Sequence, residues 1–190
     1  MKKHYIDANQ LLEDSFRLAW QVFESGYRPN YVVGVWRGGA PVGVAVHELL
    51  DTLGVDSDHI AIRTLSYTGI GERDSTVQVH GLEYLLERIG ANDRLLLVDD
   101  VHDTGLSIDR AINALESALD APMPEVKIAT PYFKPANNQS GHVPDYFLHE
   151  TDQWLVFPHE LDGLSIEEIA ANKPALADLV EHISAAKRSG

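Results

Sequence analysis

The residues with the clearest capacity for chemistry lie in one stretch, 95–107. An apolar run delivers two adjacent carboxylates, Asp99 and Asp100, and a turn with two hydroxyl residues, Thr104 and Ser107, opens a segment of helical period. Paired carboxylates at the carboxyl end of a buried strand suit vicinal ribose hydroxyls or a hydrated Mg²⁺. Backbone N–H groups, hydroxyls and a helix N-terminus bind a phosphate without basic side chains. The stretch therefore predicts a phosphate site beside a ribose or a magnesium ion.

Two further features add to this site. Asp103 lies between the carboxylate pair and the phosphate turn, near the expected reacting carbon of a bound sugar, and is the candidate general acid or base. A second strand-to-helix turn, residues 34–41, contains Gly38, Gly39 and the guanidinium of Arg37. Glycine lets backbone N–H groups approach an anion closely, so this turn suits a diphosphate. Taken alone, it is equally typical of an ordinary turn.

The acidic pair has other interpretations. It resembles the magnesium-binding acid of a nucleotide hydrolase, but such an enzyme needs Gly-x-x-x-x-Gly-Lys-Ser/Thr, which does not occur in the chain. The acidic pocket of a receiver domain is disfavoured, because its paired acids follow the first strand. A solvated strand end remains an open alternative.

The composition excludes several classes of protein. The chain has 190 residues, 15 Lys and Arg against 29 Asp and Glu, and a formal charge of −14, which disfavours broad contact with nucleic acid or anionic lipid. The absence of cysteine excludes thiol nucleophiles, disulfides and cysteine-held metal sites. The nine histidines show no His-Glu-x-x-His pattern. No apolar run approaches the roughly 20 residues of a spanning helix, so we expect a cytoplasmic protein without membrane contact.

The elements that must position these residues alternate between strand-like and helical segments. This alternation predicts an α/β fold in which a mostly parallel sheet is flanked by helices. The expected strands are 31–36, 59–65, 95–98, 126–133, 146–149 and 154–157, with a short strand at 77–79. Helices are expected from Asp7, from Pro41 to near Gly54, from Ile108, after the capping pattern Ser165–Glu168, and from Pro174. The buried face of the first helix is predicted to hold Leu12, Phe16, Ala19 and Phe23.

Residues 95–107 resemble the phosphoribosyl pyrophosphate (PRPP) signature of the type I phosphoribosyltransferases, and residues 34–41 resemble their pyrophosphate loop. The resemblance implies that fold in a single domain, with a core of about 28–150, a small hood from the N-terminal segment and about 151–190, and a mobile loop of about 66–80. It also implies Mg²⁺ as cofactor and a cis peptide between Trp36 and Arg37. The implied PRPP-binding residues are Arg37, Gly38, Asp99, Asp100, Asp103, Thr104, Gly105, Leu106 and Ser107. Asp103 is the implied catalytic residue, and Asp100 and Glu160 are the implied metal ligands.

Three local features resemble the hypoxanthine-guanine and xanthine-guanine phosphoribosyltransferases. Lys134 is similar to the lysine that recognises the base in those enzymes, and Trp154-Leu155 is similar to their stacking aromatic residue and its neighbour. Ser66-Tyr67 is similar to the start of their mobile loop, from which Arg73 is expected to reach the pyrophosphate. An ammonium group only donates hydrogen bonds, so Lys134 favours a 6-oxo group over the 6-amino group of adenine.

The resemblance therefore implies transfer of 5-phosphoribosyl from PRPP to a 6-oxopurine, with release of pyrophosphate, in purine salvage. Two alternatives stay open: a phosphoribosyltransferase for another acceptor, and a PRPP-sensing regulator with little catalysis. The expected partners are PRPP and a purine base, without nucleic acid or membrane. A homodimer or homotetramer is implied by the resemblance alone.

Overall fold

The computed structural model describes residues 3–66 and 77–189 of the chain. The described residues fall into two compact units, one within residues 9–152 and a smaller one within residues 3–8 and 153–189. The larger unit is built around a sheet of seven described strands in the order β4-β3-β2-β5-β7-β6, with β8 paired to β7. Its elements are α1 (Ala8–Glu24), β2 (Tyr31–Val35), α2 (Gly39–Thr52), β3 (Asp58–Ser66), β4 (Val77–His80), α3 (Leu82–Leu86), β5 (Arg94–Val98), β6 (Val101–His102), α4 (Leu106–Ala118), β7 (Glu125–Phe133), the 3-10 turn η1 (Pro135–Asn137) and β8 (Tyr146–Glu150).

The sheet confirms the predicted mostly parallel α/β fold. The strand pairs β2–β3, β2–β5, β5–β7, β6–β7 and β7–β8 are all parallel, and only the pair β3–β4 is antiparallel. Parallel strands end at a common edge, so the segments that follow β2, β5 and β7 emerge together there. These are the segments in which the sequence places its candidate residues.

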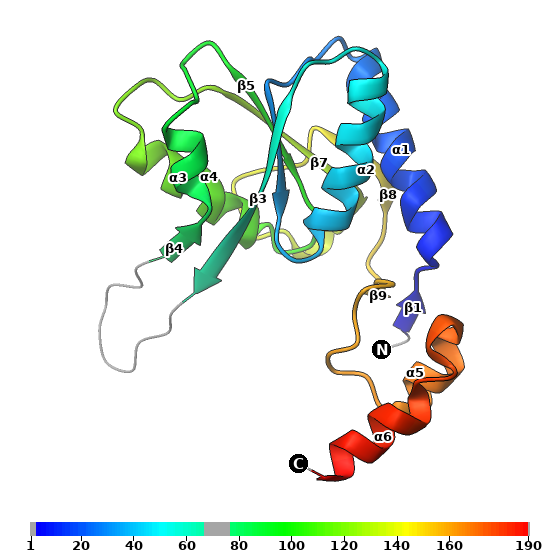
Figure 1. Cartoon of the computed structure of the whole chain (residues 1–190). Helices are drawn as coiled ribbons and strands as arrows, with labels where there is room; N and C mark the ends of the chain where they lie inside the picture. The colour runs from blue at the N-terminus through cyan, green and yellow to red at the C-terminus, as the bar shows by residue number, and fades with distance from the viewer. Residues whose placement is uncertain (1–2, 67–76, 190) are drawn as a thin grey trace, which may run out of the picture. The chain divides into compact units, whose positions relative to one another are not determined.

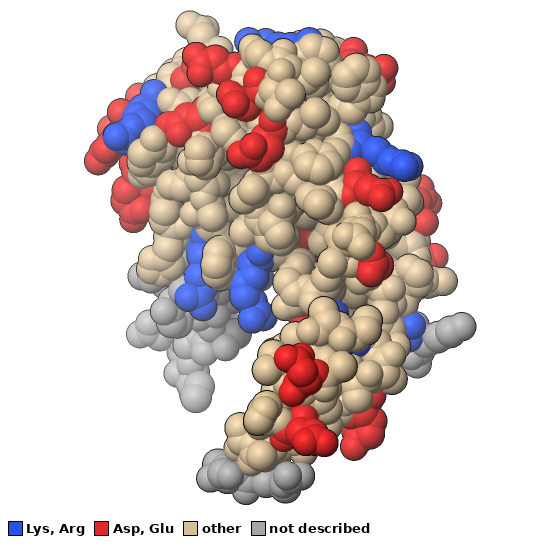
Figure 2. Space-filling model, turned by 45° about the vertical axis from the view of Figure 1, so that its right-hand side comes forward, with Lys and Arg blue, Asp and Glu red and all other residues tan. Residues whose placement is uncertain are grey.

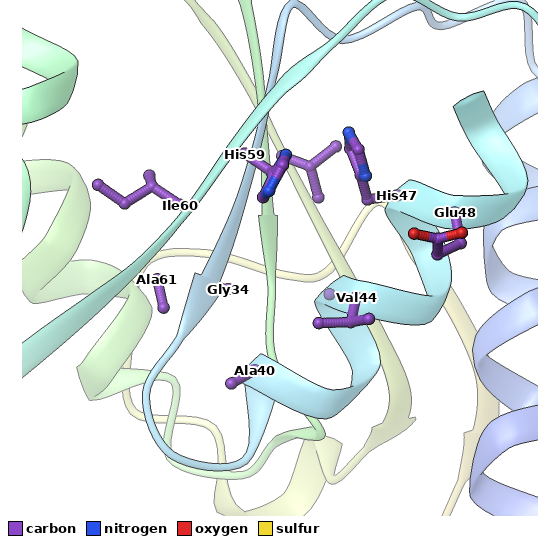
Figure 3. A pocket seen from close by; sticks show the side chains of 10 residues that line it. Gly34, Ala40, Val44, His47, Glu48, His59, Ile60 and Ala61 are labelled. Atoms are coloured by element: carbon purple, nitrogen blue, oxygen red, sulfur yellow. The ribbon is translucent and has the colours of Figure 1, made fainter.

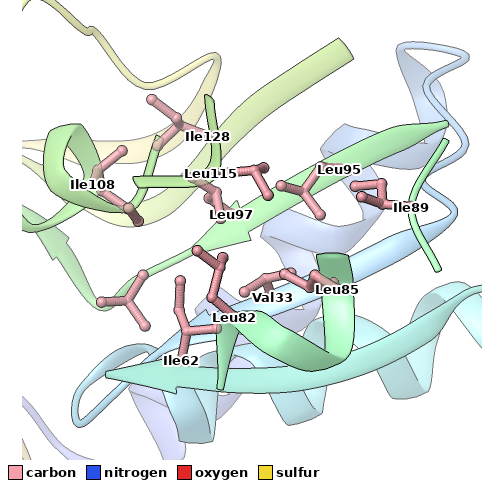
Figure 4. Packing of buried hydrophobic residues seen from close by; sticks show 12 residues of the cluster. Val33, Ile62, Leu82, Leu85, Ile89, Leu95, Leu97, Ile108, Leu115 and Ile128 are labelled. Carbon is pink, nitrogen blue, oxygen red and sulfur yellow. The ribbon is translucent and has the colours of Figure 1, made fainter. Parts of the chain in front are cut away.

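Helices cover both faces of the sheet, with α1 and α2 on one face and α3 and α4 on the other (Figure 1). Side chains that alternate along each strand supply both cores, since neighbouring residues point to opposite faces. On the α3 and α4 side, Val33 of β2 and Leu97 of β5 pack with Leu85 of α3 and Leu115 of α4 (Figure 4). All four are buried. The strands that carry the candidate site therefore rest on a closely packed support.

The buried face of α1 differs in part from the predicted one. Ala19 is buried as predicted, but Leu12 and Phe16 are 48% and 37% exposed, and the helix also buries Leu11, Asp14, Ser15, Leu18 and Val22. The prediction failed for Leu12 and Phe16 because apolar residues occur around much of this helix, so the sequence does not single out one face. The buried Asp14 carboxylate accepts hydrogen bonds from Tyr132 Oη at 3.4 Å and His149 Nε2 at 2.9 Å. These partners compensate the cost of burying it.

The smaller unit consists of the paired parallel strands β1 (Lys3–Tyr5) and β9 (Trp154–Val156), helix α5 (Ile166–Asn172), the 3-10 turn η2 (Pro174–Leu176) and helix α6 (Val180–Ser189). Ser165 and Glu168 form the predicted capping box at the start of α5. The continuous helix predicted from Pro174 is wrong, because η2 and α6 are separate elements.

The charges on the surface agree with the acidic composition. Figure 2 shows acidic side chains scattered over the visible face, with basic side chains in a few separate places. None of the helices in the described parts of the chain is both long enough and apolar enough to cross a membrane.

Candidate functional site

Asp99 and Asp100 lie in a gap between two short strands. β5 ends at Val98, and β6 begins at Val101 and pairs with the last residues of the same neighbour, β7. The backbone N–H of Asp100 donates to Asp99 Oδ1 at 2.9 Å, which fixes one carboxylate against the chain. The predicted carboxylate pair therefore sits at the carboxyl end of a central strand, where ligands bind in α/β sheets.

The Asp99 carboxyl is electrostatically unusual. Burial raises its pKa well above the usual range, and the neighbouring Asp100 carboxylate raises it further. Desolvation and a like charge both disfavour the ionised form, so a cation or a hydrogen-bond donor bound here would relieve both costs. The pair is thus arranged to receive such a group.

The glycine turn predicted to bind diphosphate packs directly against this carboxylate pair. A Cβ at Gly38 would lie 2.5 Å from Asp100 Oδ1 and nearer still to the rest of that carboxylate. A Cβ at Gly39 would lie 2.9 Å from the Asp99 Cα and would overlap the Val98 carbonyl oxygen. Only glycine allows this close approach. The two sequence motifs, about 60 residues apart, therefore meet at one place.

One other expectation for this turn can be compared with the structure. The peptide bond between Trp36 and Arg37 is cis, which confirms that prediction. Trp36 is 52% exposed, and Arg37, two residues before the start of α2, is also exposed.

The predicted phosphate turn leads into α4. Gly105 has a left-handed backbone, with φ of 73°, and helix α4 starts at Leu106. The N–H of Leu106 points to Thr104 Oγ1 at 3.4 Å. A Cβ at Gly105 would come within 2.5 Å of His102 Nε2 and 2.8 Å of Ser140 Cβ. Backbone conformation and close packing both require glycine here, and together they place the hydroxyl of Thr104 beside the N-terminus of α4.

Asp103 contacts two donors from the segment that follows β7. Lys134 Nζ lies 2.8 Å from Asp103 Oδ2, and Asn137 Nδ2 donates to Asp103 Oδ1 at 2.8 Å. Lys134 is 7% exposed, so its ammonium is held at the site rather than in solvent. The structure thus brings Asp103, the predicted general acid or base, into contact with Lys134, the lysine predicted to recognise the purine. Sequence reasoning missed Asn137, whose only sequence signal is the polar run of residues 137–140 after Lys134.

The remaining predicted residues fall elsewhere or outside the described chain. Ser66 is the last residue of β3, and Tyr67 and Arg73 lie outside the described residues. Trp154 and Leu155 lie on β9 of the smaller unit, where Trp154 is 54% exposed and Leu155 is buried. Glu160 Oε2 accepts from the Phe157 N–H at 3.0 Å, an arrangement that stabilises the turn after β9.

The donor set for a metal is limited. Across residues 3–66 and 77–189, no group of three or more His, Asp and Glu side chains could hold a metal ion. Mg²⁺ commonly keeps several waters and binds one or two carboxylates together with substrate oxygens. The pair Asp99 and Asp100 fits this mode of binding and does not form a complete set of protein ligands.

A separate cavity lies beside the glycine turn, between α2 and the strands β2 and β3 (Figure 3). Its volume is about 240 Å³. Val44 and Ala61 line it, and His47 and His59 come together at one end, with ring centroids 4.3 Å apart. Gly34 and Ala40 of the 34–41 turn line this cavity, but Arg37, Gly38 and residues 95–107 do not, so it is distinct from the site built around Asp103.

Comparisons with known proteins identify the family of this chain. Residues 3–162 match the family model of the phosphoribosyl transferase domain. A purine phosphoribosyltransferase from Pyrococcus horikoshii is 30% identical, with a TM-score of 0.65 over 87% of this chain and 99% of that one. A comparison with curated proteins gave no match.

Two more distant structures support the fold alone. A hypothetical protein from Neisseria gonorrhoeae with bound ppGpp is 19% identical, with a TM-score of 0.68 over 92% of this chain and 97% of that one. The xanthine-guanine-hypoxanthine phosphoribosyltransferase of Helicobacter pylori is 21% identical, with a TM-score of 0.59 over 85% and 95% of the two chains. Since the family model spans most of the sequence, the chain belongs to the phosphoribosyltransferase family.

Proposed function

We propose that the protein transfers 5-phosphoribosyl from PRPP to a 6-oxopurine (hypoxanthine, guanine or xanthine) and releases pyrophosphate, in purine salvage. Membership of the family implies a transferase that uses PRPP and a base acceptor. The observation that carries the choice of acceptor is the pair formed by Lys134 Nζ and Asp103 Oδ2, 2.8 Å apart. The pair offers a donor and an acceptor side by side, and one edge of an oxopurine needs both.

The chemistry of Lys134 supports an oxopurine. An ammonium offers three donors and no acceptor, so it pairs with the 6-oxo oxygen and leaves the 6-amino group of adenine without a partner. The similarity to the Pyrococcus horikoshii purine phosphoribosyltransferase also favours a purine acceptor. Trp154 and Leu155 remain predicted contacts of the base.

Each part of PRPP has a candidate partner in the larger unit. Thr104, Gly105, Leu106 and Ser107 at the start of α4 would bind the 5-phosphate through backbone N–H groups and hydroxyls. Asp99 and Asp100 would accept hydrogen bonds from the ribose hydroxyls, and Arg37 with the Gly38 backbone would bind the pyrophosphate. These partners use few cations, which agrees with the acidic composition.

Mg²⁺ fits the carboxylate pair, with Asp100 as its predicted protein ligand and a contribution from Asp99. When bound, the ion supplies charge stabilisation for the departing pyrophosphate oxygens. Glu160 is the weaker candidate, because its carboxylate already accepts the Phe157 N–H.

In the proposed reaction, Asp103 accepts the proton that the purine loses. A ring nitrogen of the purine forms the new bond to the anomeric carbon, and the bond from that carbon to the pyrophosphate oxygen breaks with its electron pair. The proton of the ring nitrogen passes to the Asp103 carboxylate. Lys134 next to Asp103 stabilises the negative charge of the carboxylate before the transfer.

The proposal is tested with purified protein, Mg²⁺, PRPP and a panel of bases, measuring pyrophosphate release. We expect turnover with at least one of hypoxanthine, guanine and xanthine, and a much slower reaction with adenine. Turnover only with adenine or a pyrimidine would show that the enzyme uses another acceptor and would refute the choice of an oxopurine. PRPP binding by calorimetry without turnover of any base would instead support a PRPP sensor.

A further inference from the structure

The segment that begins at the end of β7 is hydrogen-bonded to the signature turn through its backbone. The N–H of Lys134 donates to the His102 carbonyl at 2.9 Å. The N–H groups of Gln139 and Ser140 donate to the Thr104 carbonyl at 2.9 and 3.1 Å. The backbone is therefore fixed on both sides of Asp103, and the remaining freedom of that residue lies in its side chain.

Two side chains of the same segment remove this freedom. Lys134 Nζ binds Asp103 Oδ2 and Asn137 Nδ2 binds Asp103 Oδ1, each at 2.8 Å. The turn η1 brings Asn137 back toward the site, with its N–H donating to the Lys134 carbonyl at 3.1 Å. Each oxygen of the carboxylate thus has its own donor, one charged and one neutral.

Lys134 and Asn137 are expected to behave differently when a purine binds. Under the proposed function, Lys134 also donates to the 6-oxo group, so its contact with Asp103 weakens at the moment when the carboxylate must face the ring nitrogen. The Asn137 amide has no such second task. We propose that Asn137 is a positioning residue that holds Asp103 Oδ1 and keeps Oδ2 directed at the purine during proton transfer. This inference rests on the proposed function.

The exposure of Asn137 separates positioning from folding. Asn137 is exposed, so its hydrogen bond satisfies no buried group, and its loss should cost little stability. The neighbouring Gln139 is also exposed and contributes only its backbone N–H to the contacts given above. Gln139→Ala is therefore a matched control in the same loop.

The test compares Asn137→Ala, Asn137→Asp and Asn137→Gln with the wild type and with Gln139→Ala, in steady-state assays with the preferred oxopurine. We expect Asn137→Ala to lower kcat roughly tenfold, as expected for a misdirected acid or base, with the KM for PRPP within about twofold. Asn137→Asp has nearly the same shape but opposes one carboxylate with another, so it should lose at least as much. Asn137→Gln keeps the amide and should recover part of the rate, and Gln139→Ala should match the wild type.

A double variant distinguishes action through Asp103 from an independent effect. Once Asp103 is Asn, the further change Asn137→Ala should lower kcat by less than twofold. Wild-type kcat in Asn137→Asp, or a full tenfold loss added to Asp103→Asn, would overturn the positioning role while the base panel still supports the enzyme. Failure of the wild type to use any oxopurine would overturn both proposals, and that result is read from the wild type alone.

Discussion

Replacement of Gly39 by alanine tests the meeting of the two motifs most directly. The new Cβ would lie 2.9 Å from the Asp99 Cα, about 0.6 Å inside the ~3.5 Å at which two carbons pack well, and closer still to the Val98 carbonyl oxygen. The obstructing atoms are backbone at the end of the central strand β5, which cannot turn aside as a side chain would. We expect a loss of about 3 kcal/mol, the upper end of the range for overpacking.

Urea unfolding measures this loss. With a slope of about 2–3 kcal/mol per molar urea, a loss of about 3 kcal/mol lowers the midpoint by roughly 1 M or more. Gly141→Ala is the matched control, because no atom lies within 4 Å of its Cβ position and its φ is outside the left-handed region. The control should stay within about 0.5 kcal/mol of the wild type.

Gly38→Ala separates the site from the fold. Its Cβ would overlap the Asp100 carboxylate, which can rotate away for about 1 kcal/mol. Stability should therefore fall little, whereas affinity for PRPP, measured by calorimetry with Mg²⁺, should fall at least tenfold. If Gly39→Ala unfolds at the wild-type midpoint, or Gly38→Ala binds PRPP normally, the close approach of the turn to the acidic pair is refuted.

Three further predictions concern the charged residues. Asp103→Asn should lower kcat with the preferred oxopurine at least 100-fold and leave PRPP affinity within about threefold; full activity would remove Asp103 as acid or base. Lys134→Ala should raise the KM for the oxopurine roughly tenfold or more, and an unchanged KM would contradict its role in base recognition. The raised pKa of Asp99 means that the folded state binds its proton more tightly than the unfolded state, so this residue lowers stability as pH rises above about 3.8, the usual value, and through the raised pKa. Asp99→Asn should therefore unfold at a higher temperature than the wild type at pH 8 in the absence of ligand. The difference in unfolding temperature should vanish toward pH 3.5. A difference independent of pH would show that Asp99 is not held in a desolvated site beside a like charge.

Much of the larger unit was predictable from the sequence because its central strands appear as short, mostly apolar runs that can be recognised without knowledge of distant residues. The runs that became β2 and β5 are rich in Val and Leu, and the buried half of β7 is apolar and aromatic; Arg37 follows β2 after one residue, Asp99 follows β5 and Lys134 follows β7. Such runs define both the strand and the point where it ends. The placement of the signature turn at the carboxyl edge of a parallel sheet followed from this pattern.

The features that escaped prediction depend on contacts between distant residues. Asp14 is buried because Tyr132 and His149 reach it from β7 and β8, and no local pattern in α1 contains that information. Asn137 is a polar residue in a polar loop, and its contact with Asp103, on which the proposed positioning role rests, follows only from the return of η1 toward Asp103. The short helix α3 was not predicted at all, since five residues carry too little periodicity to be detected.

The acidic composition and a polyanionic substrate are reconciled by where the charges lie. Asp99 and Asp100 hold carboxylates at a buried strand end, and the pKa of Asp99 is raised by burial and by its neighbour, so the empty site is electrostatically unfavourable. The PRPP phosphates alone would add like charge, whereas Mg²⁺ alone would lack the substrate oxygens that complete its ligand set. Each component is therefore expected to bind better in the presence of the other, so under the proposed function we expect the site to recognise the metal complex of PRPP. Backbone donors at Gly38 and at the start of α4 can then serve the phosphates without the cations that the composition withholds.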